Sequence, residues 1–265
     1  MALPASGQIT MNQVNVELGN SGTAQIDMNS AAVRGLFGIA SGEIEMADGY
    51  GKSNTVYRMN FPYNVANCYV TAASSTDLAL GTGDYTLEWW HKGLNPEWVL
   101  VYDQGYGSGV GLSIWIDPAG AIALYYNGAS GVSDQTPNNV ISMNTWYHIA
   151  VVRYGSSVKI YVDGTLLLTS TTLAVNLGTQ ARPFSIAGAY SNHNYQYEGS
   201  LSNIRLVKGT AVYTSAFTSP TANLTNISGT VLLTGQNSTI VDNSSAGRTL
   251  TVSGSVTMAT NNPPF

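Results

Sequence analysis

WYHIAVVRYGSSVKIYVDG, residues 146–164, is the stretch that decides the fold of this chain. Apolar residues recur at every second position over residues 147–152, which is the period of a β-strand with one buried face. The same alternation resumes over residues 158–162, after a Gly- and Ser-containing turn. Asp163-Gly164 supplies the two positive-φ residues that a two-residue hairpin requires. Residues 165–169 are then predicted to return as a third strand.

The composition of the chain favours an all-β protein. Charged residues make up only 9% of the 265 residues, whereas there are 28 Gly and 16 Tyr. Long helices would need many more Glu, Lys and Arg to solvate their outer faces. Frequent Gly and abundant Tyr and Val instead indicate short strands joined by turns.

Charge and hydropathy argue against two classes of partner. The net charge is −5, the pI is near 5.0 and no block of basic residues occurs, so we expect no nucleic-acid binding. No apolar run approaches the roughly 20 residues of a membrane span, so we expect no membrane insertion.

The first residues lack the basic and apolar regions of a signal peptide, and Cys68 has no partner for an intrachain disulfide. These features predict folding in a reducing cytoplasm.

Further strands are predicted along the rest of the chain, separated by turns that contain Gly or Pro. These strand candidates are residues 68–70, 85–90, 100–103, 110–116, 121–126 and 200–209, with late edge strands at 231–233 and 249–252.

Three motifs resemble the laminin-G, pentraxin and concanavalin A-like family of β-sandwiches. They are LALGTGDYTLEWW at residues 78–90, the hairpin of residues 146–164, and SLSNIRLVKG at residues 200–209. The resemblance implies a mainly β protein, with a concanavalin A-like (laminin-G-like) jelly-roll sandwich over residues 55–265. This family is a binding scaffold, so function has to be argued from the site.

An internal repeat of the form Ile-x-Met occupies the N-terminal segment. Its copies contain Ile9 and Met11, Ile26 and Met28, and Ile44 and Met46. Each copy is predicted to form a very short strand with both apolar side chains on one face. A helical pattern follows the first two copies, with Gly19 and Gly38 at the expected C-terminal ends. We therefore expect a small α+β module over residues 1–54, preceding the sandwich.

The N-terminal segment also resembles a short module found at the N-termini of tailed-bacteriophage virion proteins. The matching stretches are LPASG at residues 3–7, AAVR at 31–34 and YGKS at 50–53. The resemblance implies a structural component of a phage particle, as a tail fibre, tail tip or capsid decoration, made in the host cytoplasm. Fewer than 55 residues with few large apolar side chains bury little core alone. The Ile and Met pairs are therefore candidates for assembly with other virion proteins, and we expect a homo-oligomer.

The acidic and histidine residues of the sequence favour a protein that is not an enzyme. Glu43, Glu45 and Asp48 are similar to the E-x-D-x-x-E pattern of laminarinase-type sandwich glycosidases, but with the outer and inner residue types exchanged and outside the predicted sandwich. We interpret them as a solvated strand edge and turn. His91, His148 and His193 have no partners at zinc-binding spacing, and His148 is predicted to be a structural residue.

The stretch AYSNHNYQY at residues 189–197 is the principal candidate for ligand binding. It concentrates aromatic rings and amide groups, which suit stacking on sugar rings and hydrogen bonding to hydroxyls. The candidate ligand-binding residues are Tyr190, Asn192, His193, Asn194 and Tyr195, with Trp98 and Tyr106 from two other segments. Tyr197 is expected in the core. Tyr190 and Tyr195 have the alternative of meeting a neighbouring subunit.

Two further alternatives stay open. No cofactor is expected, but sandwich relatives bind calcium through loop carboxylates, for which Asp103, Asp117, Asp134 and Asp242 are the candidates. The function predicted is a phage particle protein whose sandwich projects for adhesion or for carbohydrate binding at the host surface. The alternative is a non-viral carbohydrate-binding module.

Overall fold

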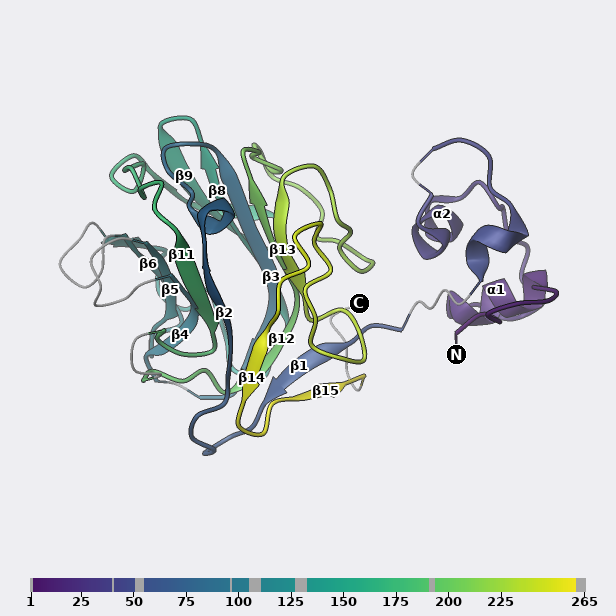
Figure 1. Ribbon diagram of the computed structural model, residues 1–265, viewed down its shortest axis with the longest axis horizontal. Coiled ribbons are helices and arrows are strands. Elements are labelled where there is room, and N and C mark those ends of the chain that lie inside the picture. Colours follow the sequence, from purple (N-terminus) through teal and green to yellow (C-terminus); the bar gives the residue numbers. More distant parts are fainter. Residues whose placement is uncertain are drawn as a thin grey trace. The chain divides into compact units, whose positions relative to one another are not determined.

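The computed structural model describes residues 2–39, 41–50, 55–95, 97–104, 111–126, 133–190 and 194–260. The chain divides into two compact units, and the boundary along the sequence falls between Val56 and Tyr57. The N-terminal unit is helical, whereas the larger unit consists of strands in two layers (Figure 1).

One layer, sheet A, contains eight antiparallel strands among the described residues. Its order is β10 (Thr165–Ser170), β9 (Ser157–Val162), β8 (Tyr147–Tyr154), β3 (Tyr85–Gly93), β12 (Gly199–Lys208), β1 (Arg58–Phe61) and β15 (Thr257–Ala259), with β13 (Thr230–Thr234) also paired to β12.

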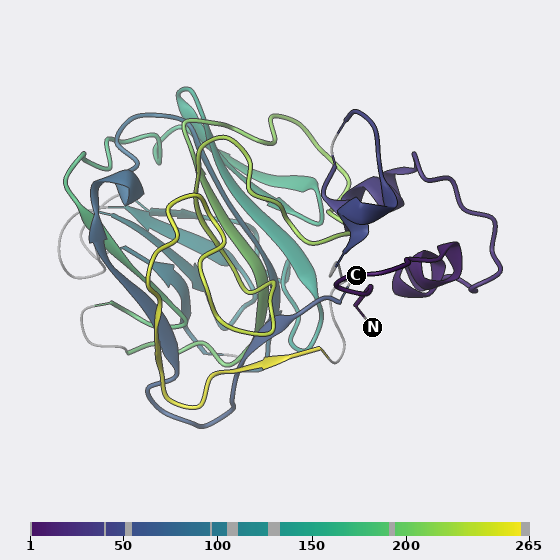
Figure 2. The ribbon, with the colours of Figure 1, turned by 45° about the vertical axis from the view of Figure 1, so that its right-hand side comes forward.

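The opposing layer, sheet B, contains seven antiparallel strands within the described part of the chain. Its order is β14 (Thr251–Ser253), β2 (Tyr69–Ser75), β11 (Arg182–Ile186), β4 (Val99–Asp103), β5 (Leu112–Ile116), β6 (Ile122–Tyr126) and β7 (Ser133–Gln135). A short 3-10 helix, η2 (Thr76–Leu78), follows β2. The C-terminal strands β14 and β15, yellow in Figure 2, lie at edges of the two sheets.

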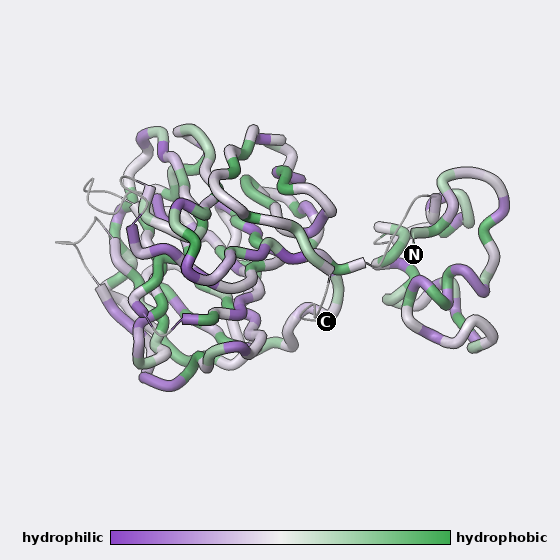
Figure 3. Tube along the Cα trace, turned by 90° about the horizontal axis from the view of Figure 1, so that it is seen from below, coloured by the Kyte–Doolittle hydropathy of each residue, from purple (hydrophilic) through white to green (hydrophobic). Residues whose placement is uncertain are grey.

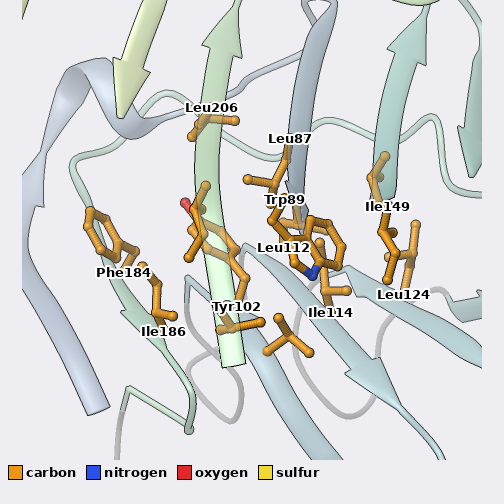
Figure 4. Packing of buried hydrophobic residues seen from close by; sticks show 14 of the residues in the cluster. Leu87, Trp89, Tyr102, Leu112, Ile114, Leu124, Ile149, Phe184, Ile186 and Leu206 are labelled. Atoms are coloured by element: carbon orange, nitrogen blue, oxygen red, sulfur yellow. The ribbon is translucent and has the colours of Figure 1, made fainter. Parts of the chain in front are cut away.

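The core lies between the sheets and follows from strand alternation. Leu87 and Trp89 of β3 face Ile114 and Leu124 of β5 and β6, and all four are at most 1% exposed (Figure 4). Because successive side chains of a strand point to opposite faces, their neighbours in sequence point outward. Hydrophobic and hydrophilic segments accordingly alternate over short distances along the sandwich (Figure 3). The mainly β sandwich predicted from the sequence is confirmed.

The hairpin that decides the fold differs from its prediction in one respect. Asp163 and Gly164 have φ of 47° and 76°, as the two-residue turn requires. However, β8 is buried on both faces rather than on one, because Ala150 and Val152 contact residues of a later segment. The alternation of apolar and polar residues had indicated one solvated face.

Four strands were not predicted from the sequence: β1, β7, β11 and β15. Three of them contain three or four residues, and β11 begins with Arg182 and Pro183, which interrupt any apolar alternation. Such segments are strands because a neighbouring strand pairs with them, which a local pattern does not reveal.

In the N-terminal unit, the Ile-x-Met copies do not form strands, so the α+β prediction is wrong and the module is helical. The middle residues cap turns or helices instead. Thr10 and Gln13 form a capping box at the start of α1 (Met11–Glu17), and Glu45 and Asp48 form one at η1 (Met46–Gly49). The Asp27 carboxylate accepts a hydrogen bond of 2.9 Å from the Asn29 N–H. The middle residues therefore form caps rather than strand positions, because Thr, Asp and Glu side chains accept hydrogen bonds from the unpaired N–H groups where helices and turns begin.

The predicted helical segments are present in this unit. The second helix, α2 (Ala31–Phe37), begins after Ser30 and ends at Gly38, whose φ of 76° is left-handed. Val14 of α1 and Val33 and Phe37 of α2 form a small core, at most 1% exposed.

One buried residue of the sandwich breaks its apolar pattern. His91 follows Tyr85, Leu87 and Trp89 on the inward face of β3, and it is 1% exposed beside the Tyr197 ring at a centroid distance of 5.3 Å. Burial lowers the pKa of His91 from 6.5 to about 3, because a charged imidazole loses its hydration there.

Stability at acidic pH is expected to depend on His91. The unfolded chain binds a proton below about pH 6.5 while native His91 stays neutral, so its contribution falls as the pH drops from 6.5 towards 3, by up to about 1.4 kcal/mol per unit. Urea unfolding of the wild type and of His91→Leu at pH 7 and pH 4.5 measures this. The wild type should lose more stability than the variant, and equal losses would contradict the neutral buried state.

Candidate functional site

The outer face of sheet A is covered at its centre by residues 210–217, which we call the strap. The Val212 N–H donates to the Thr86 hydroxyl at 2.8 Å, and that hydroxyl donates to the Thr210 carbonyl at 3.1 Å. Tyr213 and Phe217 are stacked with centroids 3.6 Å apart and pack over Ala150, Val152 and Tyr161. This part of sheet A is therefore occupied by the chain itself.

Beneath the strap lies a buried ionic network centred on Glu88. The Arg205 guanidinium donates to Glu88 Oε1 through Nε at 2.9 Å and Nη2 at 2.6 Å, and Tyr213 donates to Oε2 at 2.8 Å. His148 Nε2 lies 3.1 Å from Oε2, which confirms a structural role for this histidine. Burial by itself would raise the pKa of Glu88, but the His148 hydrogen bond and the Arg205 charge outweigh it and hold the pKa below its ordinary value. Glu88 thus anchors the strap as a carboxylate.

The outer face of sheet B carries an aromatic cluster instead. Trp115 and Tyr125 lie on the opposite phase of β5 and β6 from the core residues, and Trp98 and Tyr195 join them from adjacent segments. We call these four side chains the aromatic face. The small or apolar residues Leu100, Ala123 and Ala189 are buried in the same cluster.

Trp115 is the centre of the aromatic face. Its ring makes edge contacts with Tyr195 at a centroid distance of 4.8 Å, with Tyr125 at 6.0 Å and with Trp98 at 6.1 Å. Trp115 is only 4% exposed, whereas Trp98 is 39% and Tyr195 is 44% exposed. Two exposed rings thus rest on a buried one, which restricts their rotamers while leaving them open to solvent.

Backbone hydrogen bonds fix the segment that carries Tyr195. The Leu100 N–H of β4 donates to the Tyr195 carbonyl at 2.8 Å, and the Ala189 N–H donates to the Asn194 carbonyl at 3.0 Å. The Asp103 carboxylate accepts hydrogen bonds from the Tyr190 N–H at 2.8 Å and from the Ser113 hydroxyl at 2.6 Å. Strand β4 therefore holds both sides of this loop.

The predicted ligand-binding residues are brought together only in part. Trp98 and Tyr195 meet at the aromatic face, although 97 positions separate them in the sequence. Tyr190 is 36% exposed, and its N–H is bound to Asp103. Asn194 contributes the carbonyl that closes the loop. The remaining candidates, Asn192, His193 and Tyr106, lie outside the described residues. Tyr197 is 1% exposed, as expected for a core residue.

Sequence reasoning missed Trp115 and Tyr125. The signal was present in the stretch LSIWI, residues 112–116, where Trp115 shares its phase with Ser113 rather than with the inward Leu and Ile residues. A large aromatic side chain on the outward phase of a strand indicates either a covered face or a binding surface.

The four aspartates that were candidates for calcium binding each have a different local partner. Asp103 binds the Tyr190 loop, Asp117 accepts from the Ala121 N–H at 2.7 Å, and Asp134 accepts from the Gln135 N–H. Asp242 pairs with Arg248 at 3.3 Å. Among the described residues, no three His, Cys, Asp or Glu side chains gather as a metal site would need. Calcium binding stays a prediction.

The carboxylates examined for catalysis lie in the helical module. Asp48 accepts a hydrogen bond of 2.8 Å from the Glu45 N–H, while Glu43 and Glu45 are exposed. Their geometry is that of a capped 3-10 turn rather than of a strand face, so the laminarinase-like spacing does not place them side by side as alternating strand residues.

In the described part of the chain, no helix has the length and apolarity to cross a bilayer.

The chain is similar in sequence to one family and in fold to several solved structures. Residues 66–220 match the model of the concanavalin A-like lectin/glucanases superfamily. The structure is similar to a Bacteroides ovatus protein described as carbohydrate-binding, with a TM-score of 0.51 and 16% identity over 80% of this chain and 62% of the other. No curated protein sequence matches the chain.

Two other solved structures are similar at lower scores. A heptameric SAP-like pentraxin from Limulus polyphemus has a TM-score of 0.48 and 14% identity over 61% of this chain and 80% of its own. The CBM40 of a Ruminococcus gnavus sialidase, bound to α2,3-sialyllactose, has a TM-score of 0.46 and 13% identity, covering 58% of this chain and 93% of its own. At these identities the likeness is one of fold.

Replacing Arg205 by Met should destabilise the sandwich by about 3–5 kcal/mol, because it leaves the Glu88 carboxylate buried without its main partner. Chemical denaturation measures this loss. Lys208→Met on the same strand removes a partly exposed cation that donates a long hydrogen bond to the Thr76 carbonyl, and it should cost no more than about 0.5 kcal/mol. The double variant Glu88→Gln/Arg205→Met should be more stable than Arg205→Met alone. Equal stability of the two would contradict the proposed coupling.

Proposed function

Because the chain belongs to the concanavalin A-like lectin/glucanase superfamily, we propose that it binds carbohydrate through the aromatic face of sheet B. The observation that carries this proposal is the pair of exposed rings, Trp98 and Tyr195, held against the buried Trp115. By contrast, the strap occupies the corresponding part of sheet A.

The chemistry of the face suits neutral, hydroxylated ligands. Sugar rings have apolar C–H faces that pack on aromatic rings, and aromatic side chains contribute large contact areas with few rotatable bonds. Asp103, the carboxylate that holds the Tyr190 end of the segment carrying Tyr195, is buried and accepts hydrogen bonds from the Tyr190 N–H and the Ser113 hydroxyl. We expect stacking and neutral hydrogen bonds to dominate, so salt should have little effect on binding.

The finer proposal is a role in a tailed-phage particle. It is supported by the resemblance of residues 3–53 to N-terminal modules of virion proteins and by the surface of the helical unit. Met11 and Val16 of α1 are 37% and 52% exposed, and Val16 lines a hollow of about 330 Å³ with Leu3 and Pro4. Exposed apolar residues next to a hollow suit docking on another chain.

In this proposal, the protein is made in the host cytoplasm and joins the virion as a homo-oligomer. The helical module contacts other virion proteins, and the sandwich projects towards a host-surface glycan. Single carbohydrate sites are weak, but many copies on one particle raise the overall avidity. The sandwich acts by binding without catalysis. A non-viral carbohydrate-binding module is the alternative, and it shares the aromatic face but not the attachment role.

Removing the exposed rings should weaken carbohydrate binding without unfolding the protein. In the double variant Trp98→Ala/Tyr195→Ala, the affinity for glycans on arrays and host cells is expected to fall by at least about tenfold. Tyr154→Ala is the matched control, because Tyr154 is 52% exposed at the β8–β9 turn, away from the aromatic face. Unchanged binding by the double variant would refute this site. If oligomer assembly fails instead, the aromatic face is a subunit contact.

The attachment role is tested separately. Deleting residues 2–54 should leave a cooperatively unfolding, glycan-binding sandwich that no longer joins particles. The milder variant Met11→Glu/Val16→Glu, which changes two exposed residues of α1, should also reduce incorporation because it places charges on the apolar surface. Normal incorporation of both variants would contradict virion attachment while leaving carbohydrate binding by the sandwich intact.

A further inference from the structure

A second hollow lies at one end of the sandwich, at the point where β3 ends and β4 begins. Its volume is about 290 Å³, close to the lower end of the range for small-molecule sites. Val99, Ile141 and Met143 give it apolar walls, and His91, Asn95 and Asp117 line it with polar groups. We call it the end pocket. The aromatic residues of the aromatic face do not line it.

His91 is the first unusual feature of the end pocket. It occupies an inward position of β3 that the preceding alternate residues fill with Tyr, Leu and Trp. Its Nδ1 is buried and has no hydrogen-bond partner, and its pKa near 3 keeps the ring neutral. Buried polar atoms are nearly always paired, so an orphaned one next to a hollow indicates a missing partner.

Asn95 and Asp117 add oxygen acceptors. Asn95 Oδ1 is also buried without a partner. Asp117 is 8% exposed, and one carboxylate oxygen accepts from the Ala121 N–H at 2.7 Å. None of the described residues forms an ion pair with Asp117, and neither Lys nor Arg lines the end pocket. The pocket therefore offers oxygen acceptors, a neutral imidazole whose orphaned nitrogen can accept in one tautomer, and a carboxylate that has no ion-pair partner among the described residues.

The walls of the end pocket are held by backbone hydrogen bonds from different segments. The Asn144 N–H donates to the Gly93 carbonyl at 2.7 Å, which ties residues 139–144 to the end of β3. The Ile141 N–H donates to the Gly120 carbonyl at 2.9 Å, which ties the same segment to the β5–β6 turn. A ligand would therefore enter a preformed site and lose little free energy to reorganisation.

We propose that the end pocket binds a small primary amine, with its ammonium group at His91, Asn95 and Asp117. An ammonium has three donors and no acceptor, which matches a site that lacks cations and leaves acceptors unpaired. The Asp117 carboxylate supplies a charge-assisted hydrogen bond and the countercharge. The apolar walls contact the carbon skeleton of the ligand. This site is independent of the proposed carbohydrate surface on sheet B.

The test uses three probes in NMR titrations of the full chain, with the His91 ring signals as the readout. Glucosamine and n-butylamine carry the ammonium and should both shift these signals saturably. N-acetylglucosamine lacks the ammonium and should not. Saturable binding of N-acetylglucosamine at the same signals, or no response to either amine, would overturn the proposal.

Charge and acceptor variants locate the site. Asp117→Asn keeps the side-chain oxygen that accepts from the Ala121 N–H but removes the charge, and it should weaken amine binding at least about tenfold. Asp134→Asn makes the same change in net charge on β7, outside the end pocket, and should leave the affinity unchanged. For His91→Leu, the readout is the amide signal of Asp117, and the affinity should also fall.

Two outcomes separate this proposal from the carbohydrate site. Amine binding should persist in Trp98→Ala/Tyr195→Ala, even though that variant loses glycan binding. Equal weakening by Asp117→Asn and Asp134→Asn would show a general charge effect and would overturn the specific site.

Discussion

Burial of Trp89, Ile114 and Leu124 between the two sheets fixes the direction of the side chains next to them, because successive strand residues point to opposite faces. On β5 the inward packing of Ile114 and Ile116 directs Trp115 outward. The position of Trp98 and Tyr195 depends in turn on Trp115, whose ring both of them contact. The aromatic face is therefore a consequence of the way the core is packed.

The alternation of inward and outward side chains places different residue types on the outer faces of the two sheets. On sheet A, the outward residues include a charged carboxylate, Glu88, which is buried by the strap and satisfied by Arg205, His148 and Tyr213. A buried ion pair of this kind adds little net stability, because desolvation of both charges opposes their attraction. On sheet B, the outward residues are aromatic and partly exposed. The outer face of sheet A is thus covered by the strap, whereas the outer face of sheet B keeps two aromatic rings exposed to solvent.

Much of this architecture could be predicted from the sequence, and the limits have physical reasons. The alternation in residues 146–164 and the Asp163-Gly164 turn predicted three strands that are present. The burial of Ala150 and Val152 depends on residues about 60 positions later, so no local pattern reveals it. In the N-terminal unit, Ile-x-Met satisfied the strand period, but three residues cannot distinguish a strand from the residues around a helix cap. There, Thr10 and Gln13 decided the outcome.

The candidate site was predictable only at its exposed positions. Trp98 and Tyr195 stood out as aromatic residues in polar segments, whereas the buried Trp115 between them resembled a core residue of a strand. Their proximity depends on the pairing of β4 with β5 and on the Leu100 to Tyr195 hydrogen bond, which are contacts between distant parts of the chain. Orphaned atoms such as His91 Nδ1 become visible only when the fold shows which groups lack partners.

The central claim is that carbohydrate binds to the outer face of sheet B. The NMR signals of the five tryptophans test this claim directly. Trp98 and Trp115 belong to the aromatic face, while Trp89, Trp90 and Trp146 lie outside it. Indole N–H signals, assigned by single Trp→Phe variants, can be followed during titration with oligosaccharides released from host cells. We expect saturable shifts of the Trp98 and Trp115 signals, with those of the other three unchanged. Saturable shifts confined to Trp89, Trp90 or Trp146 would contradict it.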